Sequence, residues 1–277
     1  MRIVEPNSAA TNFLSRPLCR RYAVIVLTRI STLPVKAEAD QSRTFCWAYG
    51  TLINGDAEVL GAWNSDGEQP IPVKVFGNLR DRGVEFVAHG VGNLIGAESA
   101  FMGTFGRAML LPSIEQSVAS TVAAVKPAHR AAVSNLLRAA LGDADRAPSS
   151  VAPDEISRAV LRERYPKLLR QWDEAVAPFQ PVAALPEPYR SLVRSADRTA
   201  FELHERLMKA IHRHGPFVDS VEAFDFVASA LMRADRQYQR GAREGRLARS
   251  AVAMRSGLVP GRLRGVGVPT LAERVSP

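Results

Sequence analysis

Cysteine, lysine and long apolar runs are scarce in this sequence of 277 residues. The two cysteines, Cys19 and Cys46, cannot form the disulfide framework of a small secreted protein, so we expect a reducing, cytoplasmic environment. No stretch approaches the roughly 18 apolar residues of a membrane span, and the first residues lack the apolar core of a secretory signal. These absences exclude the disulfide-rich secreted class and the membrane-spanning class, and we expect no membrane partner.

Positive charge is concentrated at the C-terminal end of the chain. The net charge is +8, and residues 236–277 hold nine arginines against two acids, so this segment carries +7 and the preceding residues +1. Arginines in such an arm can neutralise phosphates and release the counterions of a nucleic acid. Arginine also outnumbers lysine 31 to 5, which is typical of unselected sequence from a GC-rich genome. Two interpretations therefore stay open for this segment, contact with DNA or an unselected extension.

Strand-like runs dominate the first half of the expected core. The short β-branched run YAVIVLT (22–28) is typical of a strand buried on both faces. Residues 44–53 and 57–63 flank Asn54-Gly55-Asp56. Because Asn-Gly between two strand-like runs is a strong hairpin signal, we expect an antiparallel hairpin here.

Helical spacing dominates the rest of the chain. Residues 70–83 predict a helix that begins after proline and ends at glycine, and VEFVAH (84–89) predicts the next strand. Beyond that strand we find helical spacing and no strand-like alternation. Asp219 and Glu222 form a capping-box pattern, which predicts the start of a helix that runs to about Tyr238.

This layout predicts an α/β fold, namely a ribonuclease-H-like mixed sheet with a large helical insertion and C-terminal helices. Residues 17–236 are expected to form that core, with the helical insertion at about 105–190. Residues 1–16 are polar and irregular and are predicted to be disordered, and residues 237–277 are predicted to be a basic, disordered tail.

Seven local phrases occur in an order that resembles a known family. They are RPLCRRYAVIVLT (16–28), AYGTLINGDAEVLGAW (48–63), LRDRGVEFV (79–87), NLIGAESAF (93–101), ERYPKLLRQWDEAVAPF (163–179), LPEPYRSLVRS (185–195) and HGPFVDSVEAFDFVASAL (214–231). Together they resemble the catalytic core of bacterial insertion-sequence transposases of the Mutator family, over residues 16–236. The unbroken order makes the resemblance more specific than any single motif.

The resemblance implies DNA strand cleavage and transfer by two Mg²⁺ ions, which the family holds with two aspartates and a glutamate. Magnesium prefers hard, anionic oxygen ligands, and two such ions activate the attacking oxygen and stabilise the leaving one. The family's first aspartate corresponds to Thr28 in this chain. Its second corresponds to Gly92 when counted from the following Leu-x-Gly, and to Asn93 when counted from the preceding Arg-Gly.

The third acid of the family also has no carboxylate equivalent at the expected place. Ser195-Ala196-Asp197 is similar to the family's Thr-Thr-Asn, which places the acid at Ala200, whereas counting back from the later Gly-x-Phe places it at Phe201. Glu202 is the nearest acid in the sequence. We therefore expect no intact catalytic residue and no metal cofactor in this chain, although the family uses Mg²⁺.

These departures predict a homologue of an insertion-element transposase whose catalysis is impaired, with DNA as its partner. By the same resemblance we expect the chain to lack the family's N-terminal DNA-binding region. The alternative is a non-catalytic DNA-binding or regulatory remnant, which would associate with itself or with an intact transposase.

A set of arginines recurs through one predicted helical region. They are Arg190, Arg194, Arg198, Arg206 and Arg213. In the family this segment lies close to DNA, so the five are candidate nucleic-acid contacts. An ordinary solvated helix face would give the same pattern.

A nucleotide-dependent enzyme is a functional hypothesis from a different class. Gly90, Gly92 and Gly96 follow a predicted strand and open a predicted helix, as in a dinucleotide-binding turn. However, Ile95 occupies the sixth position of the fingerprint, and only helix is predicted to follow. The spacing therefore does not favour this hypothesis.

Overall fold

The computed structural model describes residues 8–34, 42–65, 69–106, 108–140, 163, 180–187 and 189–255. At its centre is a five-stranded sheet with the order β3-β2-β1-β4-β5. The strands are β1 (Arg21–Pro34), β2 (Ser42–Thr51), β3 (Ala57–Asn64), β4 (Phe86–Val91) and β5 (Met109–Leu111). The first three pair antiparallel, whereas β4 runs parallel to β1 and β5 runs parallel to β4. This mixed sheet with its helices confirms the predicted α/β class.

The hairpin between β2 and β3 forms where the sequence predicts it. Gly55 has a φ of +83°, a left-handed conformation that glycine adopts without a Cβ penalty. Leu52 N donates to Asp56 O at 2.8 Å across the turn, and Asp56 N donates to Asn54 Oδ1 at 3.0 Å. Local turn chemistry therefore determines where the chain reverses.

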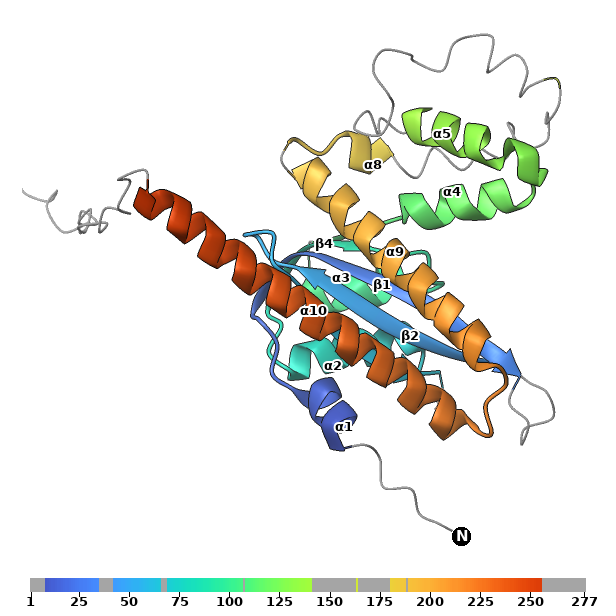
Figure 1. Ribbon diagram of the computed structural model, residues 1–277, viewed down its shortest axis with the longest axis horizontal. Coiled ribbons are helices and arrows are strands. Elements are labelled where there is room, and N and C mark those ends of the chain that lie inside the picture. Colours follow the sequence, from blue (N-terminus) through green and yellow to red (C-terminus); the bar gives the residue numbers. More distant parts are fainter. Residues whose placement is uncertain are drawn as a thin grey trace, which may run out of the picture.

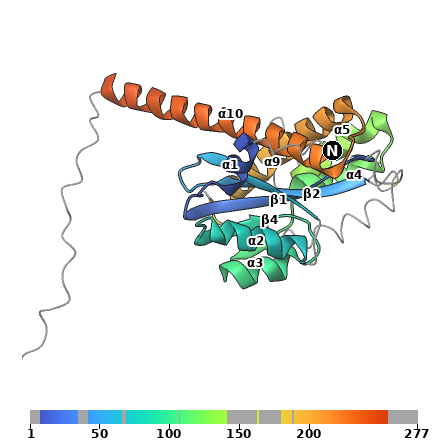
Figure 2. The ribbon, with the colours of Figure 1, turned by 90° about the horizontal axis from the view of Figure 1, so that it is seen from below.

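Helices cover both faces of the sheet (Figures 1 and 2). On one face lie α2 (Ile71–Asp81) and α3 (Ala97–Phe105), and on the other lie α9 (Tyr189–His214) and the first part of α10 (Ser220–Arg255). Because side chains alternate along a strand, β1 contributes to both cores. Leu27 packs in the cluster that holds Phe76 and Phe101, whereas Val24 and Val26 pack in the cluster that includes α9 and α10.

A short helix, α1 (Ser8–Ser15), corrects the predicted disorder of residues 1–16 over its own span, and residues 1–7 lie outside the described part of the chain. Phe13 is buried in the core cluster shared with α9 and α10. The backbone just after the helix is held by Arg82, whose Nε donates to Arg16 O at 2.9 Å. Contacts with distant parts of the chain thus order a segment that carries no clear helical pattern of its own.

Most of the described residues between β5 and α9 are helical. They form α4 (Ile114–Ala123), a 3-10 turn (Pro127–His129), α5 (Arg130–Ala140) and α8 (Gln180–Ala183). Residues 141–162 and 164–179 of the predicted insertion lie outside the described part. The prediction that only helix follows residue 89 is wrong, because β5 adds a parallel strand to β4. Three residues are too few to show a strand pattern in sequence.

The longest helix, α10, begins where the capping box predicts. Glu222 N donates to Asp219 Oδ1 at 2.8 Å, and Val218 N donates to Glu222 Oε2 at 2.6 Å. The predicted end near Tyr238 is wrong, since the helix continues to Arg255 and extends past the body of the molecule (Figure 2). Residues 256–277 of the predicted tail lie outside the described residues. In the described part of the chain, no helix is both long and apolar enough to cross a bilayer.

Candidate functional site

The first position predicted to correspond to a metal ligand of the family is Thr28 on β1. Thr28 is 1% exposed. By the alternation of the strand it projects from the same face as Val24 and Val26, which is the face covered by α9. Because β1 continues to Pro34, Thr28 lies inside the strand and not at its end. A buried, uncharged hydroxyl therefore occupies this position.

The two residues predicted as alternatives for the second position, Gly92 and Asn93, differ in the space around them, because the chain just after β4 lies close to β1. A Cβ on Gly92 would lie 2.7 Å from the carbonyl oxygen of Leu27, so a side chain there would force the two strands apart. Asn93 is exposed, and its Oδ1 accepts a hydrogen bond from Ser113 N at 2.9 Å. Position 93 therefore has room for a side chain, whereas position 92 does not. The side chain at position 93 is the uncharged amide of asparagine.

The third position lies on α9. Ala200 is 1% exposed on the helix face that packs against the sheet, so it faces the same layer as Thr28. Phe201 is half-buried, and Glu202 is exposed to solvent. The acid nearest in sequence thus points away from the layer in which Thr28 and Ala200 lie.

One buried carboxylate on α9, close in sequence to Ala200, was not among the predicted site residues. Asp197, one turn before Ala200, is 3% exposed. Its Oδ1 accepts from Ser113 Oγ at 2.6 Å, and its Oδ2 accepts from Glu115 N at 3.1 Å. Burial raises the pKa of Asp197 to about 6, although these hydrogen bonds oppose the rise.

Ser113 joins this carboxylate to the start of α4. Its Oγ accepts from Gln116 N at 3.2 Å, so Ser113 is the N-cap of the helix. The Ser-x-x-Gln pattern of residues 113–116 is a capping signal that sequence reasoning could have used. No local pattern marks Asp197 as the partner of Ser113, because the two lie far apart in the chain.

A second buried acid, Glu115, is held by cations. It is 4% exposed, and its Oε2 lies 2.7 Å from Arg138 Nη2, while its Oε1 lies 3.6 Å from Arg198 Nε. Arg194 lines the same narrow crevice. These two buried acids, Asp197 and Glu115, therefore have all four oxygens engaged by protein donors or cations.

The residues at the three predicted ligand positions do not fit a pair of Mg²⁺ ions. Two dications roughly 4 Å apart repel strongly unless anionic ligands offset their charge. Thr28 and Asn93 are uncharged, and Ala200 has no ligand atom. Among the described residues, no group of three or more His, Cys, Asp or Glu side chains could hold a metal ion.

The sequence matches the family described as Transposase, Mutator family, over residues 5–241. The chain belongs to this family. No curated protein matches the sequence significantly. The family match includes Thr28, Asn93 and Ala200, whereas most of the extended part of α10 lies beyond it.

In this Mutator-family chain, the first three candidate arginines of α9 lie beside acids. Arg190 Nε is 2.8 Å from Glu187 Oε1. Arg194 and Arg198 line the crevice that holds Glu115. The predicted row of nucleic-acid contacts is thus divided, because its N-terminal part belongs to a cluster of mixed charge.

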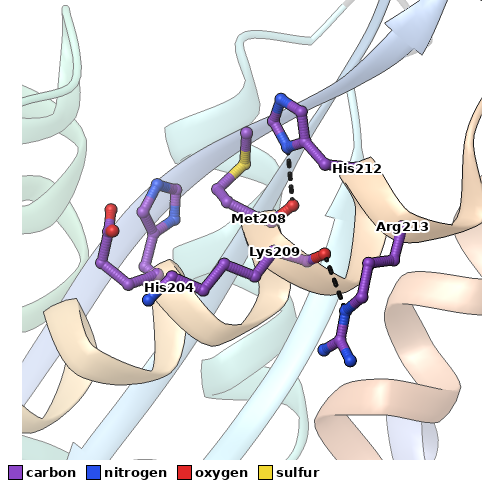
Figure 3. A pocket seen from close by; sticks show the side chains of 6 residues that line it. His204, Met208, Lys209, His212 and Arg213 are labelled. Carbon is purple, nitrogen blue, oxygen red and sulfur yellow. Dashed lines mark hydrogen bonds between the residues drawn. The ribbon is translucent and has the colours of Figure 1, made fainter.

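The other two arginines lie along the C-terminal half of α9. Arg206 Nη2 donates to Tyr238 OH at 3.2 Å, and Arg213 Nε donates to Lys209 O at 3.3 Å. Figure 3 shows an open hollow along this half of the helix. Its lining residues are His204, Glu205, Met208, Lys209, His212 and Arg213. Burial lowers the pKa of His204. The cations Lys209 and Arg213 lie on this surface together with the acid Glu205.

The glycine-rich turn after β4 does not build a dinucleotide site. Gly96 has a φ of +74° before α3, which a tight turn alone explains. A parallel strand, β5, does follow, but it leads to Pro112 and Ser113 and not to an acidic residue. The antiparallel β2 and β3 complete a sheet that is not doubly wound.

Proposed function

We propose that this chain is a transposase homologue that does not catalyse DNA strand transfer. The observation that carries the proposal is that Thr28, Asn93 and Ala200 supply no carboxylate around β1, β4 and α9. Strand transfer by two metal ions needs anionic ligands, because the ions otherwise repel each other and bind weakly. DNA is the partner that the family implies, and the described part of the chain offers no cluster of ligands for Mg²⁺.

The buried acids nearby do not replace the missing ligands. Ser113 donates to Asp197, and Arg138 pairs with Glu115. A metal ion at either carboxylate would have to displace these partners from a site that is almost closed to solvent. The two acids therefore serve the packing of α9 against α4 and α5.

The proposed fold is ribonuclease-H-like. The strand order 3-2-1-4-5 supports it, with three antiparallel strands followed by two parallel ones. The placement of α9 across the face of β1 supports it as well, since this brings positions from β1, β4 and α9 to one region of the molecule (Figure 1).

A strand-transfer assay tests the proposal. The full chain is incubated with labelled element-end DNA and Mg²⁺ or Mn²⁺, and we expect neither cleaved nor joined product. Product from the natural chain would overturn the proposal. A variant with Thr28→Asp, Asn93→Asp and Ala200→Glu is compared with a control carrying Thr28→Asn and Ala200→Gln, which adds similar volume without charge. Product from the acidic variant alone would attribute the silence of the natural chain to the missing acids.

A second candidate function is DNA binding or regulation without catalysis. The observation that favours it is the basic second half of α10, together with the exposed Arg206 and Arg213 on α9. Such a protein would act through self-association or through an intact transposase. Its signature is DNA affinity that falls steeply with salt in the absence of any strand transfer.

A further inference from the structure

The second part of α10 forms a basic helical arm, defined here as residues 236–255. The arm is helical to Arg255, and Figure 2 shows it extending away from the sheet. It contains one acid, Glu244. Its six arginines are Arg236, Arg240, Arg243, Arg246, Arg249 and Arg255. The arm therefore carries a net charge of +5, whereas residues 1–235 together carry +1.

The base of the arm is fixed to the body of the molecule. Just before it, Asp235 Oδ1 accepts from Val59 N of β3 at 2.8 Å. Within its first turn, the ring of Tyr238 packs edge-on against Tyr49, with 5.6 Å between ring centroids. A continuous helix of this length spans about 30 Å. These contacts therefore set the direction in which the arm leaves the body.

The arginine positions surround most of the arm. At about 100° per residue they spread over roughly two thirds of the helix circumference. The remaining third holds Gly241, Gly245, Ala248 and Val252. A flat partner would meet only one face of such a helix, so much of its charge would stay unused. A groove with charge on both walls matches the distribution better.

We propose that the arm lies in the major groove of duplex DNA, where its arginines contact the phosphates of both walls. The major groove of B-DNA is about 12 Å wide and admits an α-helix, and arginine is well suited to phosphate. Because phosphates carry no sequence information, the arm binds duplexes of different sequence similarly. The inference rests on the proposed DNA partner and assigns the contact to a segment that lies mostly beyond the family match at residues 5–241.

The assignment is tested by measuring equilibrium binding of the full chain to a DNA duplex of roughly 20 base pairs, about two helical turns. The measurement is repeated across a range of salt concentrations. One variant carries Arg243→Gln, Arg246→Gln and Arg249→Gln; glutamine keeps a similar helix propensity. The control carries Arg21→Gln, Arg29→Gln and Arg80→Gln, which remove three exposed arginines from the body. Each lost phosphate contact lowers the slope of log K against log salt by about 0.9. The arm variant should lose roughly 2–3 in slope and at least tenfold in affinity, and the control should keep the natural slope.

The outcomes separate the arm from the proposed DNA partner. If the arm variant binds the duplex with the affinity and salt slope of the control and of the natural chain, the arm assignment is overturned and the DNA partner stands. If the natural chain binds no duplex, both are overturned. Tighter binding to duplex RNA than to duplex DNA also overturns the assignment, because the deep, narrow major groove of A-form RNA does not admit the arm.

Discussion

Position 92 shows how a neighbouring strand decides which side chains a residue can carry. A Cβ there would lie 2.7 Å from Leu27 O, so Gly92→Asp should lower the free energy of unfolding by roughly 1–3 kcal/mol, the usual cost of overpacking. Asn93→Asp introduces the same side chain at an exposed site and keeps the acceptor for Ser113 N. It should change stability by less than about 1 kcal/mol. Urea unfolding compares the two variants, and equal losses would contradict the placement of the second ligand position at Asn93.

The positions that correspond to the family's metal ligands could be predicted from the sequence only by counting residues from the matching phrases. The phrases around Thr28 and Ala200 placed both residues on the elements that face each other. Counting left Gly92 and Asn93 as alternatives, because the contact that separates them comes from Leu27 on another strand. The burial of Asp197 was not predictable either, since it depends on Ser113 at the start of a different helix.

Between elements, Asp197 links α9 to the start of α4, and its ionisation should couple that link to pH. The pKa of its carboxyl is about 6 in the folded chain against an ordinary value of 3.8, so the folded chain binds the proton more tightly. The contribution to stability is therefore fully present below about pH 4 and is lost as pH rises to about 6. The loss amounts to at most about 3 kcal/mol.

The variant Asp197→Asn should remove most of this loss. The new Oδ1 can accept from Glu115 N, and the new Nδ2 can donate to Ser113 Oγ. We expect a gain of about 1–3 kcal/mol near neutral pH and a flatter pH dependence between about 4 and 6, measured by thermal or urea unfolding. Some slope should remain, because burial also raises the pKa of Asp235.

The matched control is Asp81→Asn at an exposed position on α2, which makes the same chemical change away from Ser113 and Glu115. If Asp197→Asn unfolds more easily than the natural chain near neutral pH and keeps its slope, Asp197 is a favourable anion and the raised pKa is wrong.

Elements with local determinants were predictable, and elements that depend on distant contacts were not. The hairpin at Gly55 and the start of α10 at Asp219 follow from residues within one turn. By contrast, β5 exists through parallel pairing with β4, and α1 is ordered by burial of Phe13. The basic half of α10 resembled a disordered tail because it lacks a clear apolar face, although several of its residues, such as arginine and alanine, are good helix formers.

Across the whole molecule, three of the phrases that carry the family resemblance meet in one largely buried network, which Asp235 of α10 joins. Arg16 Nη1 lies 2.7 Å from Glu58 Oε2. Arg82 Nη1 donates to Leu60 O at 2.6 Å, and Asp235 Oδ1 accepts from Val59 N at 2.8 Å. These contacts join the residues that directly follow α1 and α2 to β3 and α10. Much of the sequence that carries the resemblance therefore builds the fold, and within the same phrases Thr28 and Asn93 carry no carboxylate.

Binding of Mn²⁺ to the purified natural chain, followed by electron paramagnetic resonance, tests the proposed loss of the metal ligands most directly. We predict no saturable site at micromolar Mn²⁺ in the natural chain, because Thr28, Asn93 and Ala200 provide no anionic oxygen. The variant with Thr28→Asp, Asn93→Asp and Ala200→Glu should gain one. Saturable binding by the natural chain that disappears on Glu115→Gln or Asp197→Asn would contradict the proposal, because it would show that other carboxylates hold the ions.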